Sequence, residues 1–209
     1  DLQGNDDILC VTAPQVVKKA HRAYLEAGAD IIRTNTVRAN PIVQGKFRLE
    51  NMAYDIALAG ARIACESIAE YNDDILQCKT GKLGQTLERK YVAGVMGPAE
   101  DSADVGFREL VDAYSEVVRG LLDGNADILL LDSFRNLLNV KAALHAVFKV
   151  CSERQELVPV MVSGEIAEAG AGTLAGLTAR ALQHTVSSFP VFSIGLSAGE
   201  NASDLHDLL

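Results

Sequence analysis

The chain has 209 residues, and 48% of them are hydrophobic, enough for one substantial core. It is acidic, with 19 Lys and Arg against 28 Asp and Glu and a formal net charge of −9, which disfavours binding to nucleic acid or to an anionic membrane. No apolar run approaches the roughly 20 residues of a membrane-spanning helix, and the first residues do not resemble a signal peptide. We therefore expect a cytoplasmic protein with one domain, residues 1–209.

Five short apolar runs predict the strands of a sheet, because each ends in small and polar residues that are typical of a loop. Runs that are almost continuously apolar are buried on both faces, as in a parallel sheet covered by helices. A site would then collect at the carboxyl ends of the strands. The five runs are residues 29–36, 91–98, 126–133, 159–165 and 190–197.

Helices are predicted between these runs. The first, residues 14–27, has Thr12 as its expected cap and Pro14 in its first turn, and it should end at Gly28. Apolar residues then recur at helical spacing in residues 49–63, 107–122 and 137–151. A last helix, residues 179–188, follows Thr178 as its cap, whereas the polar stretch 72–90 predicts a loop.

This alternation of helix and strand leaves two α/β architectures open. One is a closed barrel of eight strands, and the other is an open, doubly wound sheet. Five strands are too few for a complete barrel, and a barrel normally begins with a strand rather than a helix. A glycine-rich segment, residues 170–176, has the spacing of a dinucleotide-binding loop, but about six residues separate it from the strand end at Ser163. We interpret it as a flexible loop.

Polar residues at the strand ends are the candidate site residues. Asp132 ends the most apolar strand and could hold the ammonium group of a ligand; alternatively, it binds a nearby helix N-terminus or loop. Thr34, Asn35 and Thr36 could bind a carboxylate or carbonyl group, or they could cap a helix. Ser163 is not part of a nucleophile elbow, since no Gly-x-Ser-x-Gly pattern surrounds it.

The cysteines and histidines show no pattern of a metal site or of a disulfide framework. They are scattered along the chain, with no Cys-x-x-Cys pair, and structural roles as reduced thiols and as surface or packing histidines are expected. These residues are Cys10, Cys65, Cys78, Cys151, His21, His145, His184 and His206.

With these segments in order, the chain resembles the homocysteine-binding domain of cobalamin-dependent methionine synthase, in the zinc-dependent homocysteine S-methyltransferase family. The resemblance is densest in residues 21–32 and covers nearly the whole chain. The matching segments are residues 4–9, 21–32, 34–36, 94–98, 119–124, 141–144, 172–176 and 193–196.

The resemblance implies a (β/α)8 barrel and a role in methionine biosynthesis. In that family zinc, held by three cysteine thiolates, activates the sulfur of homocysteine for attack on a methyl group carried by methylcobalamin on another domain. Thr34 and Asp132 would grip the amino-acid end of homocysteine, with Asp132 in place of the family's usual glutamate. Asn35 and Ser163 would line the same mouth of the barrel.

The chain also departs from the family pattern. Ser197 and Ala198 stand where the family has Asn-Cys, so that Ala198 occupies the position of the first zinc ligand. The adjacent cysteine pair of the family's eighth strand has no counterpart. Arg33 replaces a common glutamate, and Glu165 replaces a usual threonine. We therefore expect neither zinc nor methylcobalamin to be bound by this chain.

The sequence thus predicts a partial (β/α)8 barrel with family strands two to six. The leading hypothesis is a truncated homocysteine S-methyltransferase domain of methionine synthase that is incomplete or inactive by itself, with cobalamin- and folate-binding domains of a parent enzyme as partners. The alternative is a degenerate, non-catalytic domain that binds a small amino acid or a partner protein. The third hypothesis is an unrelated, doubly wound binding module. Open barrel edges predict self-association.

Overall fold

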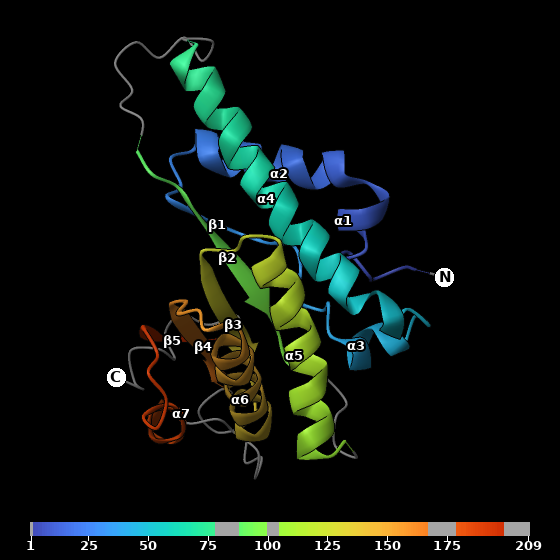
Figure 1. Ribbon diagram of the computed structural model, residues 1–209, viewed down its shortest axis with the longest axis vertical. Helices are drawn as coiled ribbons and strands as arrows, with labels where there is room; N and C mark the ends of the chain where they lie inside the picture. Colours follow the sequence, from blue (N-terminus) through green and yellow to red (C-terminus); the bar gives the residue numbers. More distant parts are fainter. Residues whose placement is uncertain (1, 78–87, 100–104, 167–178, 199–209) are drawn as a thin grey trace.

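The computed structural model describes residues 2–77, 88–99, 105–166 and 179–198, and Figure 1 shows the arrangement of its elements. The described strands form one parallel sheet, and their order in the sheet is their order in the sequence. All five predicted strands are confirmed. The strands are β1 (Ile31–Arg33), β2 (Tyr91–Met96), β3 (Ile128–Phe134), β4 (Val160–Ile166) and β5 (Ser193–Ala198).

The strand order distinguishes between the two architectures. A doubly wound sheet reverses its strand order at a switch point, whereas a barrel adds each new strand beside the previous one. The order β1-β2-β3-β4-β5 has no reversal. The protein is therefore a part of a TIM-type barrel, as predicted, and the doubly wound alternative is wrong for the described sheet.

The five predicted helices are present, and each packs against the next along one side of the sheet (Figure 1). Two short helices, α1 (Leu9–Thr12) and α3 (Pro41–Gly45), were not predicted, and the first residues of the helix predicted from residue 49 form a 3-10 turn, Glu50–Met52. The helices are α1 (Leu9–Thr12), α2 (Pro14–Glu26), α3 (Pro41–Gly45), α4 (Ala53–Leu76), α5 (Phe107–Asp123), α6 (Leu137–Arg154) and α7 (Ala179–Val186).

The start of α2 differs from the prediction. Thr12 is the last residue of α1, and its hydroxyl donates a hydrogen bond to the carbonyl of Ile8 at 3.1 Å. The residue before α2 is Ala13, which makes no side-chain cap. Thr12 is thus not the cap of α2, because the preceding helical turn takes its hydroxyl. The predicted end at Gly28 is confirmed, and Gly28 has a φ of +99° that favours glycine.

The stretch 72–90 was predicted as a loop, but α4 continues through its first part to Leu76. Tyr71 is buried, Ile75 packs on the core, and Asp74 pairs with Arg22 of α2 at 2.6 Å, so tertiary contacts extend the helix. Residues 78–87, the glycine-rich residues 170–176 and the predicted cap Thr178 lie outside the described residues.

The core lies between the sheet and the helices, on what we call the helix side of the sheet. Alternate strand residues point into this core. The opposite side, the open side, carries Arg33, Leu130 and Asp132 at the alternate positions, all of them exposed or half-buried. The core strand residues that are at most 3% exposed include Ile32, Val92, Leu129, Leu131, Val160 and Val162.

Glycines let α4 and α5 approach closely. A Cβ atom on Gly120 would lie 2.6 Å from the carbonyl oxygen of Tyr54, and one on Gly124 would lie 2.4 Å from the Cβ of Ala61. No side chain larger than hydrogen fits there without a shift of the helices.

Among the described residues, no helix is long and apolar enough to cross a membrane.

Candidate functional site

A β-bulge at the end of β3 positions the predicted site residue Asp132. Leu131 pairs with Val162, and Phe134 pairs with Gly164, so that Asp132 and Ser133 both lie opposite the single residue Ser163. Leu131 and Phe134 are each fully buried in the core. The extra residue restores the inward direction of Phe134 and leaves Asp132 on the open side.

The bulge has an unusual backbone. Ser133 has a φ of +58°, in the left-handed region that side chains other than glycine rarely adopt. Non-glycine residues held in this region cluster at functional sites, where the surrounding structure maintains them. The Asp132 side chain is 15% exposed, so it is held close to the sheet but remains accessible.

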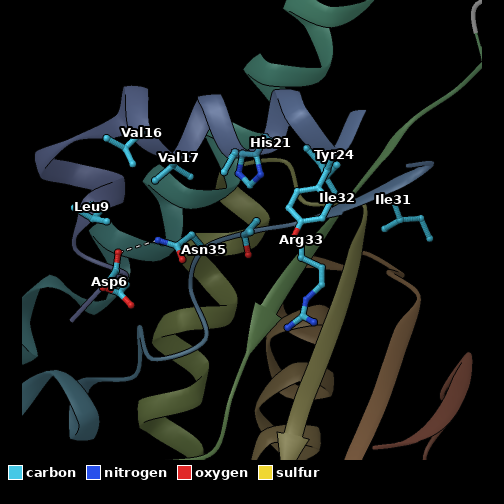
Figure 2. A pocket seen from close by; sticks show the side chains of 12 residues that line it. Asp6, Leu9, Val16, Val17, His21, Tyr24, Ile31, Ile32, Arg33 and Asn35 are labelled. Atoms are coloured by element: carbon cyan, nitrogen blue, oxygen red, sulfur yellow. Dashed lines mark hydrogen bonds between the residues drawn. The ribbon is translucent and has the colours of Figure 1, made fainter. Parts of the chain in front are cut away.

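Arg33, at the end of β1, forms an ion pair with Asp132 across the intervening strand β2. The Nη2 atom of Arg33 donates a short hydrogen bond to Oδ2 of Asp132. Figure 2 shows the Arg33 side chain leaving β1 and extending toward the neighbouring strands. In the sequence, Arg33 stands out only as a departure from the family pattern. Its alternation with the buried residues Ile32 and Thr34 was the signal that it faces the open side.

A second ion pair lies at the same edge of the sheet. Arg135, just after β3, donates a hydrogen bond to Oε1 of Glu165 in β4 at 2.6 Å. By strand alternation, Glu165 faces the same side as Ser163, which is half-buried. The carboxyl ends of β1, β3 and β4 thus present both charges on the open side.

Thr34 is buried, and its hydroxyl bridges β1 and β2. Oγ1 of Thr34 accepts a hydrogen bond from the Val95 amide at 2.9 Å and lies 2.6 Å from Oγ1 of Thr36. Thr36 donates its single proton to the Val95 carbonyl at 2.7 Å, so Thr34 is the donor between the two hydroxyls. The structure therefore places the Thr34 side chain on the helix side, away from Asp132.

Asn35 fixes the segment after β1 to the start of the chain. Its Nδ2 atom donates a hydrogen bond to the Asp6 carbonyl at 2.9 Å, and its own carbonyl accepts one from the Cys10 thiol at 3.2 Å. Nearby, Asp7 is 5% exposed and accepts a hydrogen bond from the Arg38 amide. Burial raises the pKa of Asp7 to about 6. The hydrogen bond from the Arg38 amide and the charge of Arg38 act in the opposite direction and lower this pKa.

A cavity of about 560 Å³ lies between α1, α2 and β1 (Figure 2). Its lining is mostly apolar, and Arg33, Thr34 and Asn35 contribute polar groups from β1 and the residues that follow. His21 of α2 also lines it; burial lowers the pKa of His21, and no described residue accepts from or donates to its Nε2 atom. Thr34 and Asn35 thus meet at this cavity, Asp132 and Ser163 meet at the bulge, and Arg33 contacts both places.

The described residues do not fit a zinc site. Among them, no group of three or more His, Cys, Asp or Glu side chains could hold a metal ion. Cys10, Cys65 and Cys151 are free thiols on three different helices, and burial raises the pKa of each, that of Cys10 to about 12, which opposes a thiolate ligand. Cys78 and the side chain of Ala198 lie outside the described residues.

The sequence profile of the homocysteine S-methyltransferase family matches residues 1–209. The chain belongs to this family. The match confirms the homocysteine S-methyltransferase family inferred from the order of short motifs along almost the whole chain.

Solved structures with the same fold include crystal structures of the homocysteine methyltransferase MmuM from Escherichia coli. The oxidized form is similar with a TM-score of 0.69 at 19% identity, over 90% of this chain and 63% of that one. The metallated form has a TM-score of 0.70 at 20% identity, over 96% and 71% of the two chains. The apo form has a TM-score of 0.69 at 17% identity, over 99% and 73%. This chain thus spans 63 to 73% of the MmuM chain.

Proposed function

We propose that this chain binds homocysteine by its amino-acid end at the β3 bulge, as the substrate-binding part of a homocysteine S-methyltransferase of the methionine synthase type. The observation that carries the proposal is the position of Asp132. Strand alternation directs this carboxylate to the open side, beside the bulge and at the carboxyl ends of the parallel strands, where sites of barrel enzymes gather. Family membership supplies the substrate class.

The residues around the bulge have distinct roles in this proposal. Asp132 accepts hydrogen bonds from the substrate ammonium group, and a charge-assisted bond of this type is stronger than a neutral one. Ser163, opposite the bulge, offers a hydroxyl that can donate or accept. Thr34 holds the end of β1 against β2, and Asn35 fixes the following segment to Asp6, so both maintain the mouth of the site.

Methyl transfer to homocysteine needs its thiolate, which a zinc ion supplies by lowering the thiol pKa. We propose that this chain binds neither zinc nor methylcobalamin, since Ala198 stands where the resemblance places the first zinc-ligand cysteine. Cobalamin- and folate-binding domains of a parent enzyme are the partners that would bring the methyl group. On this proposal, the described residues bind and orient the amino acid and do not activate its sulfur.

A second candidate is a non-catalytic domain that binds a small amino acid or a partner protein. The serine at position 197, where the resemblance places an asparagine beside the first zinc ligand, favours it. Both candidates leave the chain without zinc, and zinc analysis of the purified protein tests this shared expectation. Stoichiometric zinc, with thiolate absorption on a cobalt-substituted sample that depends on homocysteine, would show a metal site and overturn the metal-free proposal.

Calorimetric titration with L-homocysteine and L-methionine tests the substrate proposal. We expect binding by the natural chain and its loss in Asp132→Ala. The matched control is Asp112→Ala, which removes an exposed carboxylate paired with Lys149 on the helix layer and should leave binding unchanged. Absence of binding to both amino acids in the natural chain would refute the proposal.

We also propose that copies of the chain associate through the strand edges of the partial barrel. Among the described residues, β1 and β5 each pair with only one strand, and Ile31 of β1 is 43% exposed. Unpaired strand edges are templates for pairing with another chain. Light scattering over a range of concentrations tests this, and a monomer at high concentration would count against it.

A further inference from the structure

The pair formed by Arg33 and Asp132 joins two charges of opposite sign from strands that are not neighbours. Arg33 lies at the end of β1 and Asp132 in the β3 bulge, with β2 between them. At the register position of Arg33, β2 has Ala93, whose side chain is a single carbon. No bulky side chain at that position separates the two charges.

The two partners differ in how firmly they are held. The Arg33 side chain is 53% exposed, whereas the Asp132 side chain is 15% exposed and is fixed by the bulge. An ion pair this open to solvent contributes little net stability, because water screens it and the long side chain loses entropy when it is held. A ligand can therefore replace the pair at small cost, with Arg33 moving and Asp132 remaining in place.

The chemistry of the pair matches one class of ligand. A carboxylate binds an ammonium group, and the planar guanidinium of arginine binds a carboxylate through two parallel hydrogen bonds. An α-amino acid carries both of these groups on one carbon atom. When it enters between Arg33 and Asp132, each protein charge exchanges one partner of opposite sign for another, and neither is left unpaired.

We propose that Arg33 binds the carboxylate of the amino-acid substrate while Asp132 binds its ammonium group, so that the ligand replaces their ion pair. This inference rests on the proposed function and names the residue that makes the site selective for a zwitterion. In the unliganded protein the ion pair keeps both charges at the site. A simple amine lacks the group that Arg33 binds, and it must also displace Arg33 from Asp132.

Calorimetry with three thiols tests the inference: L-homocysteine, 3-aminopropane-1-thiol, which lacks the carboxylate, and 4-mercaptobutanoic acid, which lacks the ammonium group. The natural chain should bind homocysteine at least about tenfold more tightly than either analogue, as expected for one charge-assisted contact. In Arg33→Met, homocysteine affinity should fall by a similar factor, and 3-aminopropane-1-thiol should bind as well as before or better. Arg33→Lys should recover part of the homocysteine affinity.

The control is Arg119→Met, which removes an exposed guanidinium paired with Glu153 on the helix layer. It should leave all three affinities unchanged. If the natural chain binds homocysteine but Arg33→Met binds the three thiols with natural affinities, this inference is wrong and the proposed function stands. If the natural chain binds no homocysteine, both are overturned.

Discussion

The two sides of the sheet depend on different features of the sequence. On the helix side, consecutive strands and helices bury apolar residues in one core, and Leu131 is fully buried there. On the open side, the adjacent residue Asp132 pairs with Arg33, which lies 99 positions away in the sequence. The first side depends on local periodicity, whereas the second depends on single residues that the fold brings together. We therefore expect changes on the helix side to affect stability and changes on the open side to affect binding.

Leu131→Ala should have the largest effect on stability. The leucine is fully buried, so the variant loses apolar burial and leaves a cavity, which costs about 3 kcal/mol of unfolding free energy. Urea unfolding checks this. The neighbouring variant Asp132→Ala should lose less than about 1 kcal/mol, because its partner is an exposed arginine. Equal losses in the two variants would break the comparison between the two sides.

Asp7→Asn should remove a dependence of stability on pH. Burial raises the pKa of Asp7 from 3.8 to about 6, so between these pH values the folded protein binds more protons than the unfolded one. Stability then falls as pH rises through this window, by on the order of 2 kcal/mol. The asparagine oxygen can still accept the Arg38 amide. The free energy of unfolding, measured at pH 4 and at pH 7, should thus decrease less with pH for Asp7→Asn than for the natural chain.

The control for that measurement is Asp112→Asn, whose carboxylate is exposed on α5. It should keep the pH dependence of the natural chain. A natural chain whose stability rises between pH 4 and pH 6 would show that carboxylates other than Asp7 dominate this window.

Gly120→Ala should destabilise the contact between α4 and α5. The added Cβ would lie 2.6 Å from the Tyr54 carbonyl oxygen and 2.8 Å from the Ala57 Cβ, so the helices must move apart. Overpacking of this kind outweighs the gain in helix propensity, and we expect a net loss of about 1 kcal/mol. Thermal unfolding measures it. Gly45→Ala is the matched control, since an added Cβ there meets no atom within 4 Å; a larger loss in the control would contradict this explanation.

Arg33→Met should have the smallest effect on stability. The side chain is more than half exposed, so loss of its ion pair should change the unfolding free energy by no more than about 0.5 kcal/mol. Chemical denaturation checks this. A loss comparable to that of Leu131→Ala would mean that Arg33 is part of the structural core and that the open side is not separable from it.

The sequence predicted the elements whose pattern comes from burial. The five strands and the helix faces follow from apolar runs and from helical spacing, and these repeat because the core repeats. The prediction failed where a short element or a tertiary contact decided the structure. The sequence around Thr12 predicts a helix cap, but the Thr12 hydroxyl donates its hydrogen bond within the short helix α1, to the Ile8 carbonyl. Residues 72–76 look polar, yet contacts such as Arg22 with Asp74 keep them helical.

The candidate site was predictable only in part. The position of Asp132 at a strand end follows from the apolar run before it, but the bulge beside it, which returns Phe134 to the core, depends on pairing with β4. The Arg33 partner depends on the distance between β1 and β3, which local sequence does not specify. Thr34 and Asp132 were predicted to share one role, and the structure places their side chains on opposite sides of the sheet.

The central claim is that the β3 bulge binds the amino-acid end of homocysteine, and a crystal structure of the chain with bound L-homocysteine tests it most directly. The account predicts the ligand's ammonium nitrogen within hydrogen-bond distance of an Asp132 carboxylate oxygen, with the Arg33 guanidinium on the ligand carboxylate. Homocysteine bound instead in the cavity between α2 and β1, with the Arg33–Asp132 pair intact, would contradict it.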